Sequence, residues 1–262
     1  ASGTNTVTLT DAGAVTGNAN VETYVLADGG GTTFTLGADA QNVTTGNGAD
    51  IVDVGTRTAT GTFTTVAADT IKLGNGADVK GVDSGAGAGG AFTANTLELA
   101  SGASVTMTAA QNNSFTSATA AGTETIAISD ANDATGLATI ETYTLAAGTQ
   151  TFTLGATGQN VTADSTGATG AITIDTSTFT SVTGIFDDNT GDDTIALTLS
   201  QDGVNISSAN TTDVDTIALA NNVGATMTRA QDAKINAASG TNTVTLTDAG
   251  AVTGNANVET YV

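Results

Sequence analysis

The stretch TFTLGADAQNVTTGNGADIVDV, from Thr33 to Val54, contains two short segments in which polar or small residues alternate with apolar ones. TFTL begins at Thr33 and IVDV begins at Ile51. Alternation with a period of two predicts half-buried β-strands, and the Gly, Asn and Asp residues between the segments predict tight turns. The 18 positions between the two starts suit one turn of a parallel β-solenoid, in which each turn stacks on the next.

The same alternation recurs along the whole chain. Eleven such segments begin at Thr6, Thr33, Ile51, Thr70, Thr96, Thr125, Thr151, Ala171, Thr194, Thr216 and Thr243. We therefore predict an all-β parallel β-solenoid, similar to a β-helix or β-roll, with about ten coils in 237 residues and with Val7, Leu9 and their equivalents facing inward. Tandem antiparallel sandwiches are the alternative fold, but the chain has neither Trp nor Cys.

The sequence ASGTNTVTLTDAGAVTGNANVETYV occupies residues 1–25 and returns unchanged at residues 238–262, which predicts a tandem repeat of 237 residues. Inside it, Thr4 to Leu26 align with Thr123 to Leu145 at an offset of 119. We therefore predict a first half-repeat at 1–119, a second at 120–237, about five coils in each, and the start of the next repeat at 238–262. Neighbouring repeats or identical chains are the expected partners, stacked end to end.

Composition excludes several classes of function. The chain has 26 acidic and five basic residues and a formal net charge of -21, so we expect no nucleic-acid partner. It has no His and no Cys, which removes the common general base and the thiolate, and we expect no enzyme. The chain has no run of 18 apolar residues, so we expect no membrane insertion. No charged and then apolar leader opens the chain. A β-helix polysaccharide lyase is a remote alternative, for which Asp187, Asp188, Asp192 and Asp193 are the densest carboxylates.

Two columns of side chains follow from stacking the eleven segments. The first residue is Thr in nine of them, which predicts an outward column of Thr side chains. Ice binding by a flat array of Thr is the alternative, but the column formed by the third residues is interrupted by Asp53, Lys72 and Glu98. The preceding residue is an acid or an amide in nine of them. Such side chains either form hydrogen bonds with the backbone of turns or, where they are Asp, bind a cation.

The pairs Asp50 with Asp69, and Asp193 with Asp215, are expected on consecutive coils. Like charges roughly 4.8 Å apart repel by about 1 kcal/mol even in water. A Ca²⁺ ion with oxygen ligands at about 2.4 Å would offset this repulsion, with turn carbonyls completing its coordination. Calcium is therefore the expected cofactor.

The segment TGNGADIVD, Thr45 to Asp53, resembles the nonapeptide GGxGxDxUx of RTX calcium-binding β-rolls, and LGNGADVKG, Leu73 to Gly81, resembles it with Lys80 at the apolar position. A partial copy, NTGDDTIA, begins at Asn189 and keeps Gly191, Asp193 and Ile195. In that family the glycines allow left-handed backbone and the aspartate binds calcium between turns. With the corner aspartates, the resemblance implies metal-site residues Gly46, Gly48, Asp50, Asp69, Gly74, Gly76, Asp78, Asp193 and Asp215.

The whole chain, rich in Thr, Ala and Gly, acidic and without Cys, resembles type I-secreted S-layer proteins and giant repeat adhesins of Gram-negative bacteria. The resemblance implies an extracellular, cell-surface location. We expect a structural protein, the repeat segment of a calcium-stabilised filament, S-layer or adhesin shaft. The alternative is an adhesive module for a polysaccharide or a surface receptor, which an exposed aromatic row would mark; Tyr24, Tyr143 and Tyr261 recur once per half-repeat, with partial burial expected.

Overall fold

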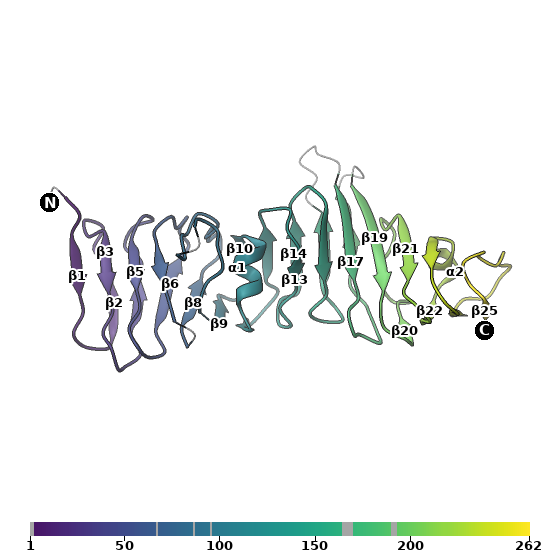
Figure 1. Cartoon of the computed structure of the whole chain (residues 1–262), viewed down its shortest axis with the longest axis horizontal. Helices are drawn as coiled ribbons and strands as arrows, with labels where there is room; N and C mark the ends of the chain where they lie inside the picture. The colour runs from purple at the N-terminus through teal and green to yellow at the C-terminus, as the bar shows by residue number, and fades with distance from the viewer. Residues whose placement is uncertain (1–2, 67, 86, 95, 164–169, 190–192) are drawn as a thin grey trace. The chain divides into compact units, whose positions relative to one another are not determined.

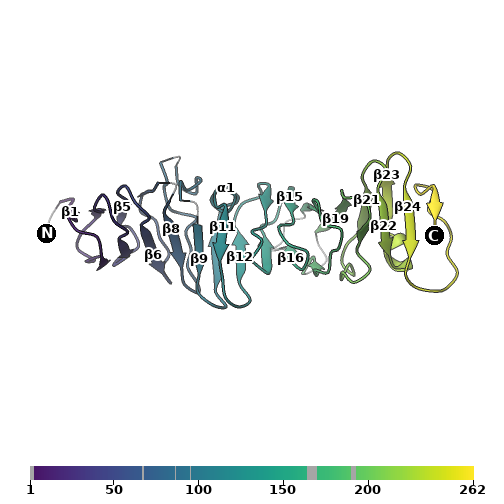
Figure 2. The ribbon, with the colours of Figure 1, turned by 90° about the horizontal axis from the view of Figure 1, so that it is seen from below.

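The computed structural model describes residues 3–66, 68–85, 87–94, 96–163, 170–189 and 193–262. Over these residues the chain is a parallel β-solenoid of about 13 turns with very little helix, as predicted (Figure 1). It divides into two compact units, the first made of residues 1–129 and 137–140, the second of residues 130–136 and 141–262. Figure 2 shows the strands of each unit in a second view, with several of them labelled.

In the first unit, a turn of the chain contributes one strand to each of two stacks. The first stack has the order β1 (Thr6–Thr8), β3 (Thr23–Val25), β5 (Asn42–Thr44), β7 (Phe63–Thr64). The second has the order β2 (Ala14–Thr16), β4 (Thr33–Thr35), β6 (Ile51–Gly55), β8 (Thr70–Leu73), β9 (Thr96–Leu99), β11 (Ser117–Thr119). The strands β10 (Ser104–Met107) and β12 (Thr125–Ile128) pair with each other, and all of these pairings are parallel.

The second unit repeats this arrangement. Its longest stack has the order β13 (Ala134–Thr135), β15 (Gln150–Thr153), β17 (Ala171–Asp175), β19 (Thr194–Leu199), β21 (Thr216–Leu219), β23 (Ile235–Ala238). The other strands stack as β14 (Thr142–Leu145), β16 (Asn160–Ala163), β18 (Phe186–Asp187), and as β20 (Val204–Asn205), β22 (Gly224–Met227), β24 (Thr243–Leu246), β25 (Thr260–Tyr261).

All eleven predicted segments are strands, but they do not form one column. Thr6 pairs with Thr23 rather than with Thr33, which pairs with Ala14 and Ile51. The prediction of one continuous Thr column is therefore wrong. Both strands of a turn carry the same kind of alternating sequence, so some of the longer intervals between segments lead from one stack to another. The structure therefore has more and shorter turns than the ten predicted per repeat.

The core consists of apolar ladders that run from turn to turn. In the first unit Phe34, Val52, Ile71 and Leu97 are successive register partners, and each is fully buried. The second unit has the same kind of ladder, made of Phe152, Ile174, Leu197 and Ile217. Burial of these side chains is the main stabilising contribution, about 2 kcal/mol for each large apolar group.

Two short helices interrupt the strands, and the sequence analysis did not predict them. They are α1 (Ala109–Ser114) and α2 (Arg229–Asp232). Each begins with a capping box, in which the preceding Thr accepts a hydrogen bond from the backbone N–H of a Gln three residues later, and the Gln side chain accepts one from the N–H of the Thr. The signal was present in the sequence, as TAAQ from Thr108 and TRAQ from Thr228.

The Gly-rich sequence from Gly81 to Ala94, GVDSGAGAGGAFTA, suggests a flexible surface loop or a bulged coil. In its described part, Val82, Phe92 and Ala94 are buried. The ring of Phe92 lies 6.4 Å from that of Phe63 and 5.7 Å from that of Phe115, centroid to centroid. The segment therefore contributes to the core as well as to the surface.

Close approach of backbones at the corners makes some glycines irreplaceable. A Cβ atom added to Gly155 would lie 1.8 Å from the carbonyl oxygen of Gly136, whereas one added to Gly158 would meet nothing nearer than 3.6 Å. We predict that Gly155→Ala lowers the free energy of unfolding by about 3 kcal/mol. The matched control Gly158→Ala should change it by less than about 1 kcal/mol. Urea denaturation measures both, and equal losses would contradict the stacking seen at this corner.

Candidate functional site

Asp50 and Asp69 lie at a corner of the first unit, and both are fully buried. One oxygen of Asp50 accepts the backbone N–H of Thr32 at 2.6 Å, and the other accepts that of Gly46 at 3.0 Å. The carboxylate of Asp69 accepts the N–H of Asp50 at 2.9 Å and that of Val66 at 2.7 Å. Each carboxylate thus ties its own turn to the preceding turn.

This ladder explains how two acidic side chains can be stacked on consecutive turns. Asp50 and Asp69 are adjacent, as predicted, because Ile51 pairs with Thr70. N–H groups that point at a carboxylate stabilise its charge, and each such bond is worth about 1.5–3 kcal/mol. The repulsion expected from the sequence is therefore offset by backbone donors. A calcium ion at this corner stays a prediction, and it would have to share oxygens that already accept hydrogen bonds.

Asp78 has a different environment. Its side chain is 17% exposed, and Oδ2 forms an ion pair with Lys80 Nζ at 2.5 Å. Lys80 is the residue at which the second motif departs from the RTX pattern, and it supplies a positive charge where a cation was expected. The glycines of the two motifs have conformational roles. A Cβ on Gly46 would lie 2.4 Å from the carbonyl oxygen of Ala27, and Gly76 has a φ of +81°.

The remaining two motif glycines also lie where turns approach each other. A Cβ on Gly48 would lie 3.2 Å from the carbonyl oxygen of Gly30, and one on Gly74 would lie 2.9 Å from that of Gly55. Gly46, Gly48 and Gly74 thus allow close packing of turns, whereas Gly76, where an added Cβ would meet nothing within 4 Å, provides a left-handed backbone conformation.

Asp193 and Asp215 are not stacked on each other. Asp215 is exposed and accepts the backbone N–H of Ile195 at 2.9 Å, two residues beyond Asp193. Asp193 is 4% exposed, and its Oδ1 accepts the N–H of Gly170 at 2.6 Å. Its Oδ2 is buried without a hydrogen-bond partner among the described residues. Two residues named from the sequence, Gly191 and Asp192, lie outside the described residues, as does the corner residue Asn95.

One group of three carboxylates in the described part of the chain has oxygens that all lie within 4.8 Å of one another. It consists of Asp187, Asp188 and Asp213. The first two were noted in the sequence, but Asp213 was missed, because it lies one turn later along the chain. Asp187 also accepts the backbone N–H of Asn189 at 2.7 Å, which is a turn interaction.

All five basic residues have structural partners. Arg57 pairs with Asp39 at 3.4 Å, Lys72 with Glu98 at 2.7 Å and Arg229 with Asp248 at 3.1 Å. Lys80 pairs with Asp78, and Lys234 Nζ donates to three carbonyl oxygens at 2.6–2.8 Å. The hydrogen bond to Glu98 raises the pKa of Lys72, which keeps this amine protonated. Each basic group is thus engaged by an acidic side chain or by carbonyl oxygens.

The ten aromatic side chains, all within the described residues, are buried or half-buried. Tyr24 lies 4.5 Å from Phe34 and Tyr143 lies 4.7 Å from Phe152, centroid to centroid, so the same aromatic pair is built once in each unit. The aromatic row that would mark a polysaccharide-binding face is therefore not formed by these residues.

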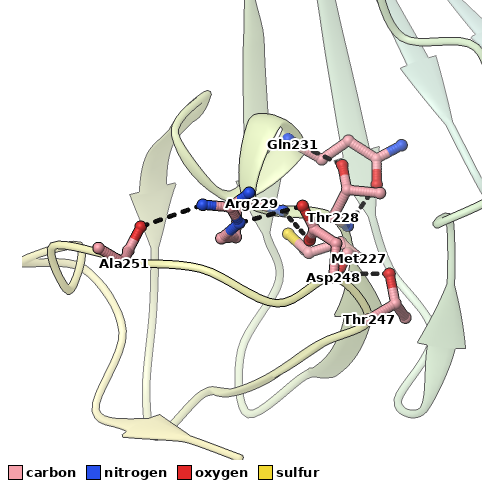
Figure 3. Close-up of polar contacts among 7 residues, drawn as sticks. All are labelled: Met227, Thr228, Arg229, Gln231, Thr247, Asp248 and Ala251. Carbon is pink, nitrogen blue, oxygen red and sulfur yellow. Dashed lines mark hydrogen bonds and ion pairs between the residues drawn. The ribbon is translucent and has the colours of Figure 1, made fainter.

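The second copy of the 25-residue sequence is seated on the turn before it. Strand β24 pairs with β22 so that Gly224 faces Thr243 and Met227 faces Leu246. Arg229, the first residue of α2, donates its backbone N–H to Asp248 Oδ1 at 2.7 Å and its Nε–H to Oδ2 at 3.1 Å (Figure 3). Its Nη1 donates to the carbonyl oxygen of Ala251 at 3.2 Å.

The backbone and side-chain hydrogen bonds from Arg229 lower the pKa of Asp248. A carboxyl whose pKa is lowered in the folded state stabilises that state above its ordinary pKa, here 3.8, and the contribution is lost as the pH falls through the lowered value. Sequence reasoning did not single out Arg229 or Asp248. The sequence does mark Arg229: the two half-repeats contain the corresponding segments TMTAAQ and TMTRAQ, which differ only by this arginine.

No family model, curated protein or solved structure matches this chain. Among the described residues, no helix is both long enough and apolar enough to cross a membrane.

The buried corner carboxylate gives a direct test of its structural role. We predict that Asp50→Ala, measured in chelator, lowers the free energy of unfolding by about 3 kcal/mol, because two backbone N–H groups lose their acceptor. The control is Asp28→Ala. Asp28 also accepts an N–H from the next turn, from Asn47 at 2.9 Å, but it is exposed, so the loss should stay below about 1 kcal/mol. A loss for Asp50→Ala that appears only with calcium would instead favour an ion at this corner.

Proposed function

We propose that this chain is a repeat segment of a structural cell-surface protein, the shaft of a filament, S-layer or adhesin. The solenoid fold is consistent with a structural repeat protein. Further support comes from the use of polar groups. The carboxylates of Asp50 and Asp69 bind backbone N–H groups of the preceding turn. The basic residues other than Lys80 bind acids or carbonyl oxygens of another turn, so these side chains serve the stacking of turns.

The observation that carries the proposal is the seating of residues 238–262. This segment has the sequence of residues 1–25, and it continues the parallel pairing of the turns before it, Ala225 with Val244 and Thr226 with Thr245. The junction between one repeat and the next is thus built in the same way as a junction inside a repeat. Repeats of this kind can be added without a break in the hydrogen-bonded stack.

The extracellular location rests on the resemblance to S-layer proteins and giant repeat adhesins. Two features of the chain agree with it. The chain has no Cys to oxidise, and its formal net charge of -21 favours solubility.

A shaft requires a length that grows in proportion to repeat number. We predict that chains with one, two and three copies of the 237-residue repeat differ by a constant length increment, because every junction copies the one at residues 224–246. Small-angle X-ray scattering and electron microscopy measure this length. A maximum dimension that grows with roughly the square root of repeat number, as in a chain of freely jointed domains, would contradict the proposal.

Calcium is proposed as a stabilising ion of this shaft. The buried Oδ2 of Asp193, which has no hydrogen-bond partner among the described residues, is the atom that best fits a cation ligand. A carboxylate oxygen in such a position is a hard ligand of the kind that Ca²⁺ prefers, and carbonyl oxygens of turns are suitable co-ligands.

The test compares thermal unfolding in Ca²⁺ and in chelator. We expect calcium at 100 times its dissociation constant to stabilise the unmodified chain by about 2.7 kcal/mol. Asp193→Asn should abolish most of this gain, because the amide keeps one oxygen for the N–H of Gly170 but loses the second. Asp28→Asn serves as the exposed control. A chain that unfolds identically with calcium and with chelator would remove calcium from the proposal and leave the shaft untouched.

A further inference from the structure

The pentapeptide GNGAD occurs twice in the chain, at residues 46–50 and at residues 74–78. Each copy places a glycine directly after an asparagine: Gly48 follows Asn47 in the first copy, and Gly76 follows Asn75 in the second. No other asparagine of the chain is followed by glycine. In both copies the asparagine and the glycine are exposed to solvent. The two sites therefore share their neighbours in sequence and their exposure, and they differ in how the adjacent turns hold them.

An asparagine followed by glycine can react without an enzyme, because glycine has no Cβ and adopts many backbone conformations. The backbone nitrogen of the glycine gives its proton to water or hydroxide and attacks Cγ of the asparagine. A new N–Cγ bond forms, the Cγ–Nδ2 bond breaks, and the amide group leaves as ammonia with a proton from the solvent. Water then opens the five-membered succinimide at either carbonyl carbon, which yields aspartate or isoaspartate. The net reaction consumes one water, releases one ammonia and adds one negative charge at neutral pH.

The following turn holds the second copy at both reacting groups. The N–H of Gly76 donates to the carbonyl oxygen of Ser104 at 2.8 Å, so the attacking nitrogen is engaged. Oδ1 of Asn75 accepts the N–H of Ser104 at 2.9 Å, so the carboxamide is held as well. Both hydrogen bonds must open before the nitrogen of Gly76 can approach Cγ of Asn75.

The first copy lacks both of these bonds. Among the described residues, neither the N–H of Gly48 nor Oδ1 of Asn47 has a hydrogen-bond partner. The carboxamide of Asn47 is held through its nitrogen, where Nδ2 donates to Oδ1 of Asp28 at 3.2 Å. Asp28 is exposed, and the same oxygen also accepts the backbone N–H of Asn47 at 2.9 Å. The one side-chain contact thus involves the leaving group and leaves the attacking nitrogen unrestrained.

We propose that Asn47 is a site of spontaneous modification in the folded protein, at which the backbone nitrogen of Gly48 converts the amide to aspartate or isoaspartate, whereas Asn75 is protected by its hydrogen bonds to Ser104. The inference goes beyond the proposed structural role and does not depend on it. In a tandem array it places one reactive amide at the same corner of every 237-residue repeat, so the array gains negative charge with age.

The products disturb the corner in which they form. Isoaspartate lengthens the main chain by one methylene group between Gly46 and Gly48. The corner has little room for it, because a Cβ on Gly46 would lie 2.4 Å from the carbonyl oxygen of Ala27 and one on Gly48 would lie 3.2 Å from that of Gly30. Aspartate places a second carboxylate beside Asp28, where like charges repel. Either product therefore weakens the stacking of this turn on the preceding one.

The two copies of GNGAD provide a control within one molecule. The folded chain is incubated in chelator at mildly alkaline pH and then digested at acidic pH, and the products at positions 47 and 75 are quantified by chromatography and mass spectrometry. We expect Asn47 to react at least about tenfold faster than Asn75, because hydrogen bonds must open only at Asn75. In guanidinium chloride the two rates should agree, because the neighbouring residues are the same.

Amide hydrogen exchange tests the physical cause of this selectivity. We expect the N–H of Gly76 to be protected in the folded chain and that of Gly48 to exchange close to the rate of an unfolded chain, as measured by nuclear magnetic resonance.

A variant that cannot form the succinimide tests the effect on stability. Asn47→Ser removes the amide but keeps the backbone N–H that Asp28 accepts. After equal incubation, the unmodified chain should unfold at a lower urea concentration than a fresh sample, and the variant should not change. Because the variant retains Asn75, it also shows that this second site contributes little.

Faster reaction at Asn47 in the folded chain, together with equal rates in denaturant, supports the proposal. Equal rates in the folded chain, faster reaction at Asn75, or a reaction at Asn47 that stops on folding overturns it. Equal protection of the Gly48 and Gly76 amides overturns the proposed cause. A chain that is modified at position 47 but unfolds like a fresh sample overturns the link to stability. None of these outcomes alters the length increment of tandem arrays, so a failure here is distinguishable from a failure of the proposed function.

Discussion

The hydrogen-bonded stacking of one turn on the next is the constraint on which the rest of this structure depends. Parallel strands must lie about 4.8 Å apart at every turn, and the corners between strands must approach equally closely. Small and β-branched side chains meet this requirement inside the strands. At the corners glycine meets it, as where Gly155 lies against the carbonyl oxygen of Gly136.

Stacking also decides where charge can be placed. A backbone N–H at the end of a strand needs an acceptor when it is buried, and a carboxylate from the next turn supplies one. Asp50 and Asp69 do this in succession, so two buried acidic groups stabilise the corner. The same logic places amides at other corners, where Asn242 accepts the N–H of Val223 at 2.9 Å. Much of the polar sequence pattern therefore serves the backbone.

The seated segment at residues 238–262 connects this structural logic to assembly. Its first strand extends a stack that contains β20 and β22, and the side chain of Arg229 forms an ion pair with Asp248. Asp248 and Asp11 are the same residue of the repeat in a covered and an uncovered state.

The sequence by itself determined the class of fold, because period-two alternation and turn residues recur wherever strands and corners form, and each of the eleven predicted segments is a strand. It also determined the stacking of Asp50 on Asp69, since their strands are 19 residues apart on neighbouring turns. Only the tertiary structure decided which strands share a sheet, because both strands of a turn carry similar patterns. The tertiary structure also decided that Asp215 lies opposite Ile195 and not opposite Asp193. A pairing register can shift by two residues and still keep every apolar side chain inside, so the sequence alone does not fix it. The contact between Arg229 and Asp248 depends on the neighbouring turn, which local sequence cannot specify, whereas the capping boxes of the short helices are local motifs.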